Sequence, residues 1–281
     1  MRIDLHTHSS ASDGMDSPTE LMVNARAAGL DVVALTDHDT TLGWAEAAAA
    51  LPAGLQLIRG AELSCSAGGI SLHLLAYLFD PTHAALTSEV SRAFGDRLGR
   101  AHKITDLLIA AGYPLTWEAV LAEVGAGAAV GRPHIADALV TARVVPDRNA
   151  AFAELLHNRS PFYVRHYALD PIEAVRLVRA AGGVPVFAHP AASVRGRTVA
   201  DEVIAAMAAA GLAGLEVDHR DHTEAAREHL RGLAAELDLL VTGSSDYHGA
   251  GKDNRLGENT TDPEVLEALL AQARGVEVVA A

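Results

Sequence analysis

The sequence alternates short apolar segments with Ala-rich helical segments, and nearly every apolar segment ends in His, Asp or Glu. Residues 2–8 (RIDLHTH) and 31–39 (DVVALTDHD) are two such segments. Strands that alternate with helices form mainly parallel sheets, and in a closed barrel the carboxyl ends of those strands carry the chemistry. The alternation therefore predicts an α/β fold. The polar strand ends favour a TIM-like barrel over an open doubly wound sheet, and no GxGxxG follows the first strand.

The alternation breaks once, in the middle of the chain. Residues 55–65 and 70–79 are apolar and predict two strands joined in a hairpin at Gly68-Gly69. Residues 88–166 have mostly helical patterns without a buried strand, and strand-helix alternation resumes after them. We expect a barrel built from residues 1–87 and 167–281, with a helical insertion at residues 88–166 that caps the barrel mouth.

Composition narrows the classes of function. Across 281 residues the formal net charge is −14, which argues against coating nucleic acid or binding anionic membranes. An anionic substrate stays compatible with this charge, because bound divalent ions can create a locally positive site. Cys65 is the single cysteine, no apolar run reaches membrane-spanning length and the first residues do not resemble a signal peptide. These features predict a cytoplasmic protein.

Two His and Asp pairs at opposite ends of the chain share one spacing. His6 and His8 are two residues apart, as are Asp246 and His248. Residues i and i+2 of a strand face the same side, so each pair can reach one metal ion. The first and last strands of a closed barrel are neighbours, so both pairs are expected to meet at the mouth.

The strand ends and adjacent loops together offer six imidazoles and three carboxylates, enough for two or three ions. Thiolate clusters are absent from the sequence, and this donor set suits Mn, Fe or Zn. A lone histidine at a strand end is more often structural, whereas the joint pattern favours a metal centre. Asp37 and Asp39 flank one of these histidines and are expected to orient it. The candidate ligands are His6, His8, Asp13, His38, Glu62 (as a bridge), His73 (which also fits a core histidine), His189, Asp246 and His248.

Five motifs resemble the PHP (polymerase and histidinol phosphatase) superfamily of metal-dependent phosphoesterases: DLHTHSSASDG, ALTDHDT, GAELS, FAHP and GSSDYHG. The resemblance covers nearly the whole chain and implies a distorted (β/α)7 barrel with two or three divalent ions. The family ligands fall on the nine residues above. GRPHIADALV, within the insertion, resembles stand-alone enzymes that act on nucleotide 3′,5′-bisphosphates or trim short RNA from the 5′ end.

The implied reaction is hydrolysis of a phosphate monoester, with 3′,5′-nucleotide bisphosphate giving nucleoside 5′-monophosphate and phosphate. The metal ions would activate the attacking water, and no separate protein acid or base is assigned. Arg132 and His134 open a predicted helix, where an anion is favoured, and are the first candidates to hold the rest of the substrate. Arg195, Arg197 and His222 are further candidates.

Several alternatives remain open at this point. Hydrolysis of a cyclic nucleotide phosphate and of histidinol phosphate use the same chemistry, and the insertion argues weakly against the latter. A non-catalytic PHP module conflicts with the unbroken ligand pattern. An amidohydrolase would usually need a carboxylated lysine, and no strand ends in Lys. The expected partner is a small phosphorylated nucleotide or a short oligoribonucleotide, rather than duplex DNA, a membrane or an obligate protein partner.

Overall fold

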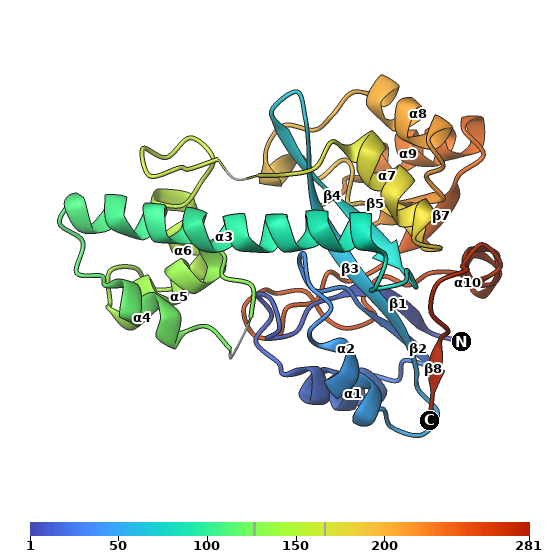
Figure 1. Ribbon diagram of the computed structural model, residues 1–281, viewed down its shortest axis with the longest axis horizontal. Helices are drawn as coiled ribbons and strands as arrows, with labels where there is room; N and C mark the ends of the chain where they lie inside the picture. The colour runs from blue at the N-terminus through green and yellow to red at the C-terminus, as the bar shows by residue number, and fades with distance from the viewer. Residues whose placement is uncertain (126–127, 166) are drawn as a thin grey trace.

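One sheet of eight strands forms the centre of the molecule (Figure 1). The computed structural model describes residues 1–125, 128–165 and 167–281, and the backbone alone of Arg195. The strands are β1 (Ile3–Thr7), β2 (Val32–Leu35), β3 (Gln56–Ala67), β4 (Ile70–Tyr77), β5 (Val184–Ala188), β6 (Gly214–Asp218), β7 (Leu240–Gly243) and β8 (Val279–Ala280).

Strands β1 to β7 lie side by side in sequence order, and β8 pairs with β3. The pairs β1–β2, β2–β3, β5–β6 and β6–β7 are parallel, whereas β4 is antiparallel to both β3 and β5. The predicted hairpin across Gly68 and Gly69 is confirmed. Both residues have positive φ (55° and 77°), which glycine adopts without steric cost.

The two edges of the row nearly close into a barrel. Thr7 of β1 forms a parallel bridge with Tyr247, just beyond β7, and the His8 N–H donates to the Tyr247 carbonyl at 2.8 Å. This closure confirms the expected TIM-like (β/α)7 barrel. Its distortion lies at β4, which runs against the other strands, so the start of this strand reaches the rim that the others reach with their carboxyl ends.

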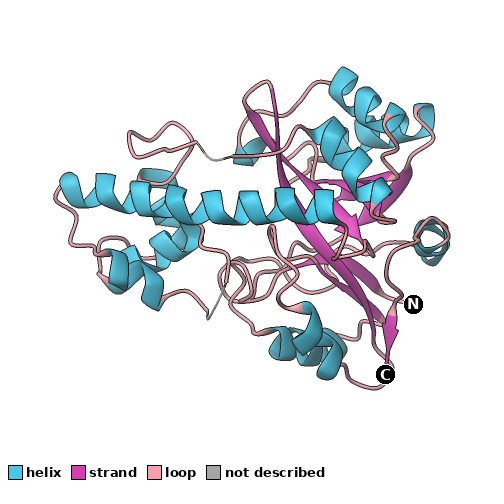
Figure 2. Ribbon diagram, viewed as in Figure 1, coloured by secondary structure: helices cyan, strands magenta, loops and turns pink. Residues whose placement is uncertain are grey.

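The helices follow the predicted alternation, and Figure 2 shows them around the sheet. Ser17 caps the first helix in a reciprocal capping box with Glu20. The barrel helices are α1 (Pro18–Ala27), α2 (Trp44–Ala49), α7 (Pro171–Ala180), α8 (Asp201–Ala209), α9 (Glu224–Glu236) and α10 (Pro263–Leu270), with a 3₁₀ turn, η1, at Ser193–Arg195.

Two apolar cores stabilise the barrel. One lies between the sheet and helices and contains residues such as Leu21, Leu35 and Val175. The other gathers side chains from strands β1 to β5, including Leu5 and Val186, and α10 adds Leu266 and Leu269. Because α10 packs against this second core, the opposite end of the barrel is left for polar side chains.

A separate group of helices extends to one side of the barrel (Figure 1). Helix α3 (Ala84–Ala110) runs from the barrel to α4 (Trp117–Ala122), α5 (Arg132–Thr141) and α6 (Arg148–Glu154). These helices share their own apolar core, which includes Ile104, Leu139 and Leu155. Helix α3 already begins at Ala84, before the expected boundary at residue 88, and the other expected boundary, His166, lies outside the described residues.

Loops gather between the sheet and this helical group in Figure 2. The loop after β1 contacts the helical group through the Ala129 N–H, which donates to the Ala11 carbonyl at 3.2 Å. Among the described residues, no helix is long and apolar enough to cross a membrane.

Candidate metal centre

Glu62 lies at the centre of a buried polar cluster at the barrel mouth. It belongs to the long strand β3, is 1 % exposed and points between the ends of the neighbouring strands. Five imidazole nitrogens approach its two oxygens at 2.7–3.3 Å, from His6, His8 and His38 on Oε2 and from His73 and His189 on Oε1. A carboxylate in contact with so many potential ligands could offer one oxygen to each of two ions, and the bridging role of Glu62 stays a prediction.

The pair His6 and His8 meets as the i, i+2 spacing predicts. Their Nε2 atoms lie 3.0 Å apart, and both side chains are fully buried. Asp246 comes from the far end of the chain and places Oδ1 3.4 Å from each of these two nitrogens. The first strand and the segment after the last one therefore contribute to one group of donors. Asp246 and His248 lie beyond β7 rather than on it, so they do not act as a strand pair, and His248 belongs to a different group.

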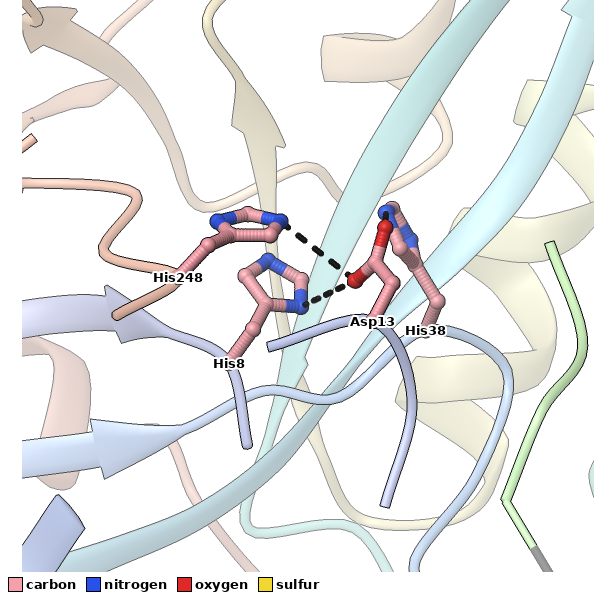
Figure 3. A group of neighbouring side chains, drawn as sticks. All are labelled: His8, Asp13, His38 and His248. Carbon is pink, nitrogen blue, oxygen red and sulfur yellow. Dashed lines mark ion pairs between the residues drawn. The ribbon is translucent and has the colours of Figure 1, made fainter. Parts of the chain in front are cut away.

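A second group of donors forms around Asp13 in the loop after β1 (Figure 3). Its Oδ1 lies 3.7 Å from His8 Nδ1 and 3.4 Å from His248 Nε2, and its Oδ2 lies 3.8 Å from His38 Nε2. In Figure 3 the three imidazoles converge on this one carboxylate from three different segments of the chain.

Ligand atoms within 4.8 Å of one another form three overlapping groups. Four of the nitrogens in these groups are buried without a hydrogen-bond partner: Nδ1 of His8, of His38 and of His73, and Nε2 of His248. Buried polar atoms normally have partners, and imidazole with carboxylate is a donor set for divalent metals. The residues present therefore fit metal ions. The groups are His8–Asp13–His38–His248, His6–His8–Glu62–Asp246 and His38–Glu62–His73.

Charges inside the cluster shift its pKa values in opposite directions. Burial alone would lower the pKa of His8, but Asp246, Glu62 and Asp13 raise it to about 9. Burial and the positive charge of Lys252 lower the pKa of His248 to about 4. The cluster thus mixes protonated and neutral rings, and divalent cations could replace the protons.

Two histidine rings are oriented by bonds on the nitrogen that faces away from the cluster. The Nδ1 atom of His6 lies 2.9 Å from Glu216 Oε1, and Glu216 also accepts the His189 N–H at 2.7 Å. His248 Nδ1 bonds the Asp246 carbonyl at 2.8 Å. Such contacts fix the tautomer and leave Nε2 for a metal. The sequence motifs assign no role to Glu216, which lies in β6.

Asp37 and Asp39 support the site in a different way from the one expected. Within the described residues their carboxylates bond neighbouring segments rather than the His38 ring. Asp37 accepts the Ser9 N–H at 2.8 Å and the Ser12 hydroxyl at 2.6 Å, which shapes the loop that carries Asp13. Asp39 accepts the Ser64 N–H at 2.8 Å and holds Arg97 of α3 at 2.5 Å. The carboxylates of Asp37 and Asp39 are occupied by these N–H and O–H donors, so they form no bond with the His38 ring among the described residues.

Arg97, which the sequence interpretation missed, begins a cluster of arginines from the helical group. Burial lowers the pKa of Arg97, but Asp39 above all, and then Asp13 and Glu62, raise it, which places it within electrostatic reach of the metal centre. Burial and the charges of Arg132 and Arg97 lower the pKa of Arg100, and burial lowers that of Arg132. We call Arg97, Arg100 and Arg132 the arginine cluster.

Two members of the arginine cluster bond neutral acceptors alone. Arg100 Nε donates to the Val164 carbonyl at 2.8 Å, and Arg132 Nη1 donates to Leu156 O and Asn158 Oδ1 at 2.8 and 2.9 Å. Among the residues that the structure describes, no carboxylate forms an ion pair with either guanidinium. Arg100 is also buried, at 9 % exposure.

The other residues expected to bind substrate occupy different surroundings. His134 is buried at the start of α5, where its Nδ1 accepts the Gly131 N–H at 3.1 Å. His222 bonds backbone with both nitrogens, to Val217 O at 2.8 Å and to Ala191 N at 3.1 Å, so it has no nitrogen left for a substrate. Arg197 is exposed in the loop after β5, and the Arg195 side chain lies outside the described residues.

Known proteins similar in sequence to this chain point to one family. Residues 4–128 match the PHP domain. The chain is 34 % identical to the 3′,5′-nucleoside bisphosphate phosphatase of Chromobacterium violaceum, over 92 % of each protein. It is 36 % identical to a 5′-3′ exoribonuclease of Haemophilus influenzae, covering 92 % of this chain and 94 % of that one. A phosphoribosyl 1,2-cyclic phosphate 1,2-diphosphodiesterase of Eggerthella lenta is 31 % identical, with 88 % and 94 % covered.

Solved structures agree over almost the full length. A Bifidobacterium adolescentis protein assigned to the metal-dependent phosphoesterases superposes with a TM-score of 0.92 at 41 % identity, covering 98 % of this chain and 96 % of that one. A Chromobacterium violaceum protein described as an amidohydrolase, solved with sulfate and without metal, gives 0.86 at 33 % identity, with 98 % of both chains covered.

Proposed function

The chain belongs to the PHP family of metal-dependent phosphoesterases, and from this premise we propose that it removes the 3′-phosphate from nucleoside 3′,5′-bisphosphates. The products would be a nucleoside 5′-monophosphate and phosphate. The observation that carries the proposal is the combination of the buried metal centre with the arginine cluster, because each would bind one phosphate of such a substrate.

The three groups of donors would hold two or three divalent ions. The groups overlap, because His8, His38 and Glu62 each belong to two of them. The imidazole and carboxylate donors suit Mn, Fe or Zn. When bound, such ions activate water and neutralise charge on the phosphoryl oxygens.

The arginine cluster is the proposed site of the distal phosphate. Arg100 and Arg132 are mutually repulsive and poorly solvated, and an anion between them would relieve both effects. Arg97 connects the two sites, since it bonds Asp39 on the barrel and lies close to Arg100 and Arg132. Arginine can donate to phosphate in bidentate fashion, which also fixes the orientation of the substrate.

His134 and Arg148 would support the phosphate at the metal centre from the helical group. His134 would contact the substrate, and Arg148 contacts the loop of Asp13. Because His134 Nδ1 accepts the Gly131 N–H, its neutral ring carries the proton on Nε2 and can donate to a substrate oxygen. Arg148 is paired with Asp137 at 2.5 Å and donates to the Asp13 carbonyl at 3.4 Å, which holds the loop of Asp13 in place. The helical group, residues 88–166, would thus cap the mouth and select the substrate.

Trimming of short RNA from the 5′ end is a second activity that the same arrangement would allow. A 5′-phosphorylated RNA begins with a 5′-phosphate, a ribose and a 3′-phosphate, and this unit differs from the bisphosphate only in the further ester on its 3′-phosphate. The relative from Haemophilus influenzae is named for such an activity. Metal centre and arginine cluster would engage the same two phosphates in either substrate.

The other candidate substrates use the arginine cluster less well. A cyclic nucleotide phosphate has one phosphate, which the metal centre would take, and leaves Arg100 and Arg132 uncompensated. Histidinol phosphate carries an ammonium group where the proposed substrate carries an anion, so the arginine cluster would repel it.

Phosphate release in the presence of Mn²⁺ tests the proposal with a panel of substrates. The panel contains adenosine 3′,5′-bisphosphate, AMP, cyclic AMP, histidinol phosphate and a short 5′-phosphorylated RNA. We expect the highest kcat/KM for the bisphosphate, with release from the 3′ position. Absence of release from every member would overturn the phosphoesterase assignment, and a preference for AMP or histidinol phosphate would overturn the role of the arginine cluster.

A further inference from the structure

His219 is a buried histidine beside the metal centre that none of the three groups of donors includes. It directly follows β6 and is fully buried. Its backbone is held firmly, because its N–H donates to Val217 O at 3.0 Å and its carbonyl accepts Arg227 Nη2 at 2.9 Å. Its ring lies 5.4 Å from the ring of His189, centroid to centroid.

A backbone hydrogen bond fixes the tautomer of this ring. The Asp221 N–H donates to His219 Nδ1 at 3.1 Å. A nitrogen that accepts a hydrogen bond carries no proton, so in the neutral ring the proton is on Nε2. An Nε2–H group is a donor and offers no lone pair to a metal ion, so this tautomer suits a supporting role rather than that of a ligand.

The Nε2 atom of His219 lies near the outer oxygen of Asp246. The Nε2 atom has no hydrogen-bond partner and is buried, so a substrate cannot reach it. It lies 3.7 Å from Asp246 Oδ2, which also accepts Lys252 Nζ at 3.1 Å. The other oxygen, Oδ1, is the one that lies between His6 and His8.

We propose that His219 is a positioning residue for Asp246, whose Nε2–H engages Oδ2 when a cation is bound and so reserves Oδ1 for the ion shared with His6 and His8. This inference rests on the proposed metal centre. Lys252 contacts the same oxygen from the solvent side, where its side chain is 35 % exposed, whereas His219 approaches the carboxylate from the protein interior. Outer partners of metal ligands typically change metal affinity about 10- to 100-fold.

The test measures Mn²⁺ binding to metal-free protein, by calorimetry and by the EPR signal of free Mn²⁺, without an activity assay. His219→Leu removes the donor at similar volume, and His219→Gln places an amide N–H near the position of Nε2. We expect Leu to weaken one class of Mn²⁺ site about 10- to 100-fold and Gln to restore most of the affinity. If the Leu variant does not fold, His219→Asn replaces it, because its shorter amide cannot reach Oδ2.

Two controls separate the possible failures. His222→Leu removes a neighbouring buried histidine that bonds backbone alone, and it should lower the melting temperature but keep the Mn²⁺ affinity. Asp246→Asn should lose the same class of site as His219→Leu. Equal weakening by His219→Gln and His222→Leu, or unchanged affinity in His219→Leu, would overturn the inference alone. A wild-type protein that binds no Mn²⁺ would overturn the metal centre itself.

Discussion

The metal centre and the arginine cluster both bury charge, but they compensate it differently. In the metal centre, carboxylates and imidazoles contact one another, as Glu62 does with His73 at 2.7 Å. In the arginine cluster, Arg100 and Arg132 bond backbone or amide oxygens and repel each other. The metal centre therefore balances its charges internally. The arginine cluster keeps an excess of positive charge, because Asp39 pairs with Arg97 but, among the described residues, no carboxylate forms an ion pair with Arg100 or Arg132.

This difference shows which ligand each region lacks. The orphaned imidazole nitrogens need cations, and the guanidinium groups need an anion. The two regions also differ in the elements that carry them. The metal ligands lie on strands or in the segments that follow them, whereas the arginines lie on helices α3 and α5.

The largest expected effect comes from removing the central charge of the metal centre. Glu62→Gln keeps the shape of the side chain but loses the carboxylate that contacts five imidazoles, so bound metal and activity should fall together. The loss of several kcal/mol of transition-state stabilisation corresponds to at least ~10³-fold in kcat. Metal analysis and phosphate release measure it. Exposed Glu236→Gln is the matched control, and full activity in Glu62→Gln would contradict the assignment of the centre.

Substitution in the arginine cluster should affect affinity for the substrate rather than the chemistry. Arg132→Met removes a charged donor worth about 1.5–3 kcal/mol, so KM for adenosine 3′,5′-bisphosphate should rise roughly 10- to 100-fold. Hydrolysis of p-nitrophenyl phosphate, which has no second phosphate, should change little. Arg176→Met on the exposed side of α7 is the control. An equal loss with both substrates would show that Arg132 supports the fold instead.

Thermal unfolding can separate the two regions in the same protein. Mn²⁺ should raise the melting temperature of both the wild type and Arg132→Met, because its site is intact in each. AMP should raise that of the metal-free wild type but not of Arg132→Met. At about one hundred times Kd, each ligand adds roughly 2.7 kcal/mol to the free energy of unfolding. Identical AMP shifts in the two proteins would place the distal phosphate elsewhere.

The smallest expected effect lies outside both regions. Ser17→Ala removes the N-cap of α1 and should lower the free energy of unfolding by about 1 kcal/mol, with kcat unchanged. Urea unfolding and a parallel assay measure it. A change in kcat would mean that α1 transmits strain to the metal centre, and the two regions could then no longer be compared independently.

The sequence by itself determined the barrel and the set of residues at its mouth. Because strands that alternate with helices are parallel, their carboxyl ends lie at one rim of the barrel, and the polar residues at those ends meet there. The i, i+2 spacing of His6 and His8 places both on one side of a strand, which local backbone geometry alone decides. The Ser-Pro start of α1 and the Gly68-Gly69 turn are equally local.

Only the tertiary structure decided which atoms meet. The antiparallel course of β4 carries His73 to the rim, although this residue lies near the start of its strand. The arginine cluster joins residues of α3 and α5, whose spacing along the chain has no pattern. His219 and Glu216 obtain their roles from bonds to Asp221 and His6, and the tautomer of an imidazole depends on such contacts. These features rest on long-range packing, which sequence periodicity does not encode.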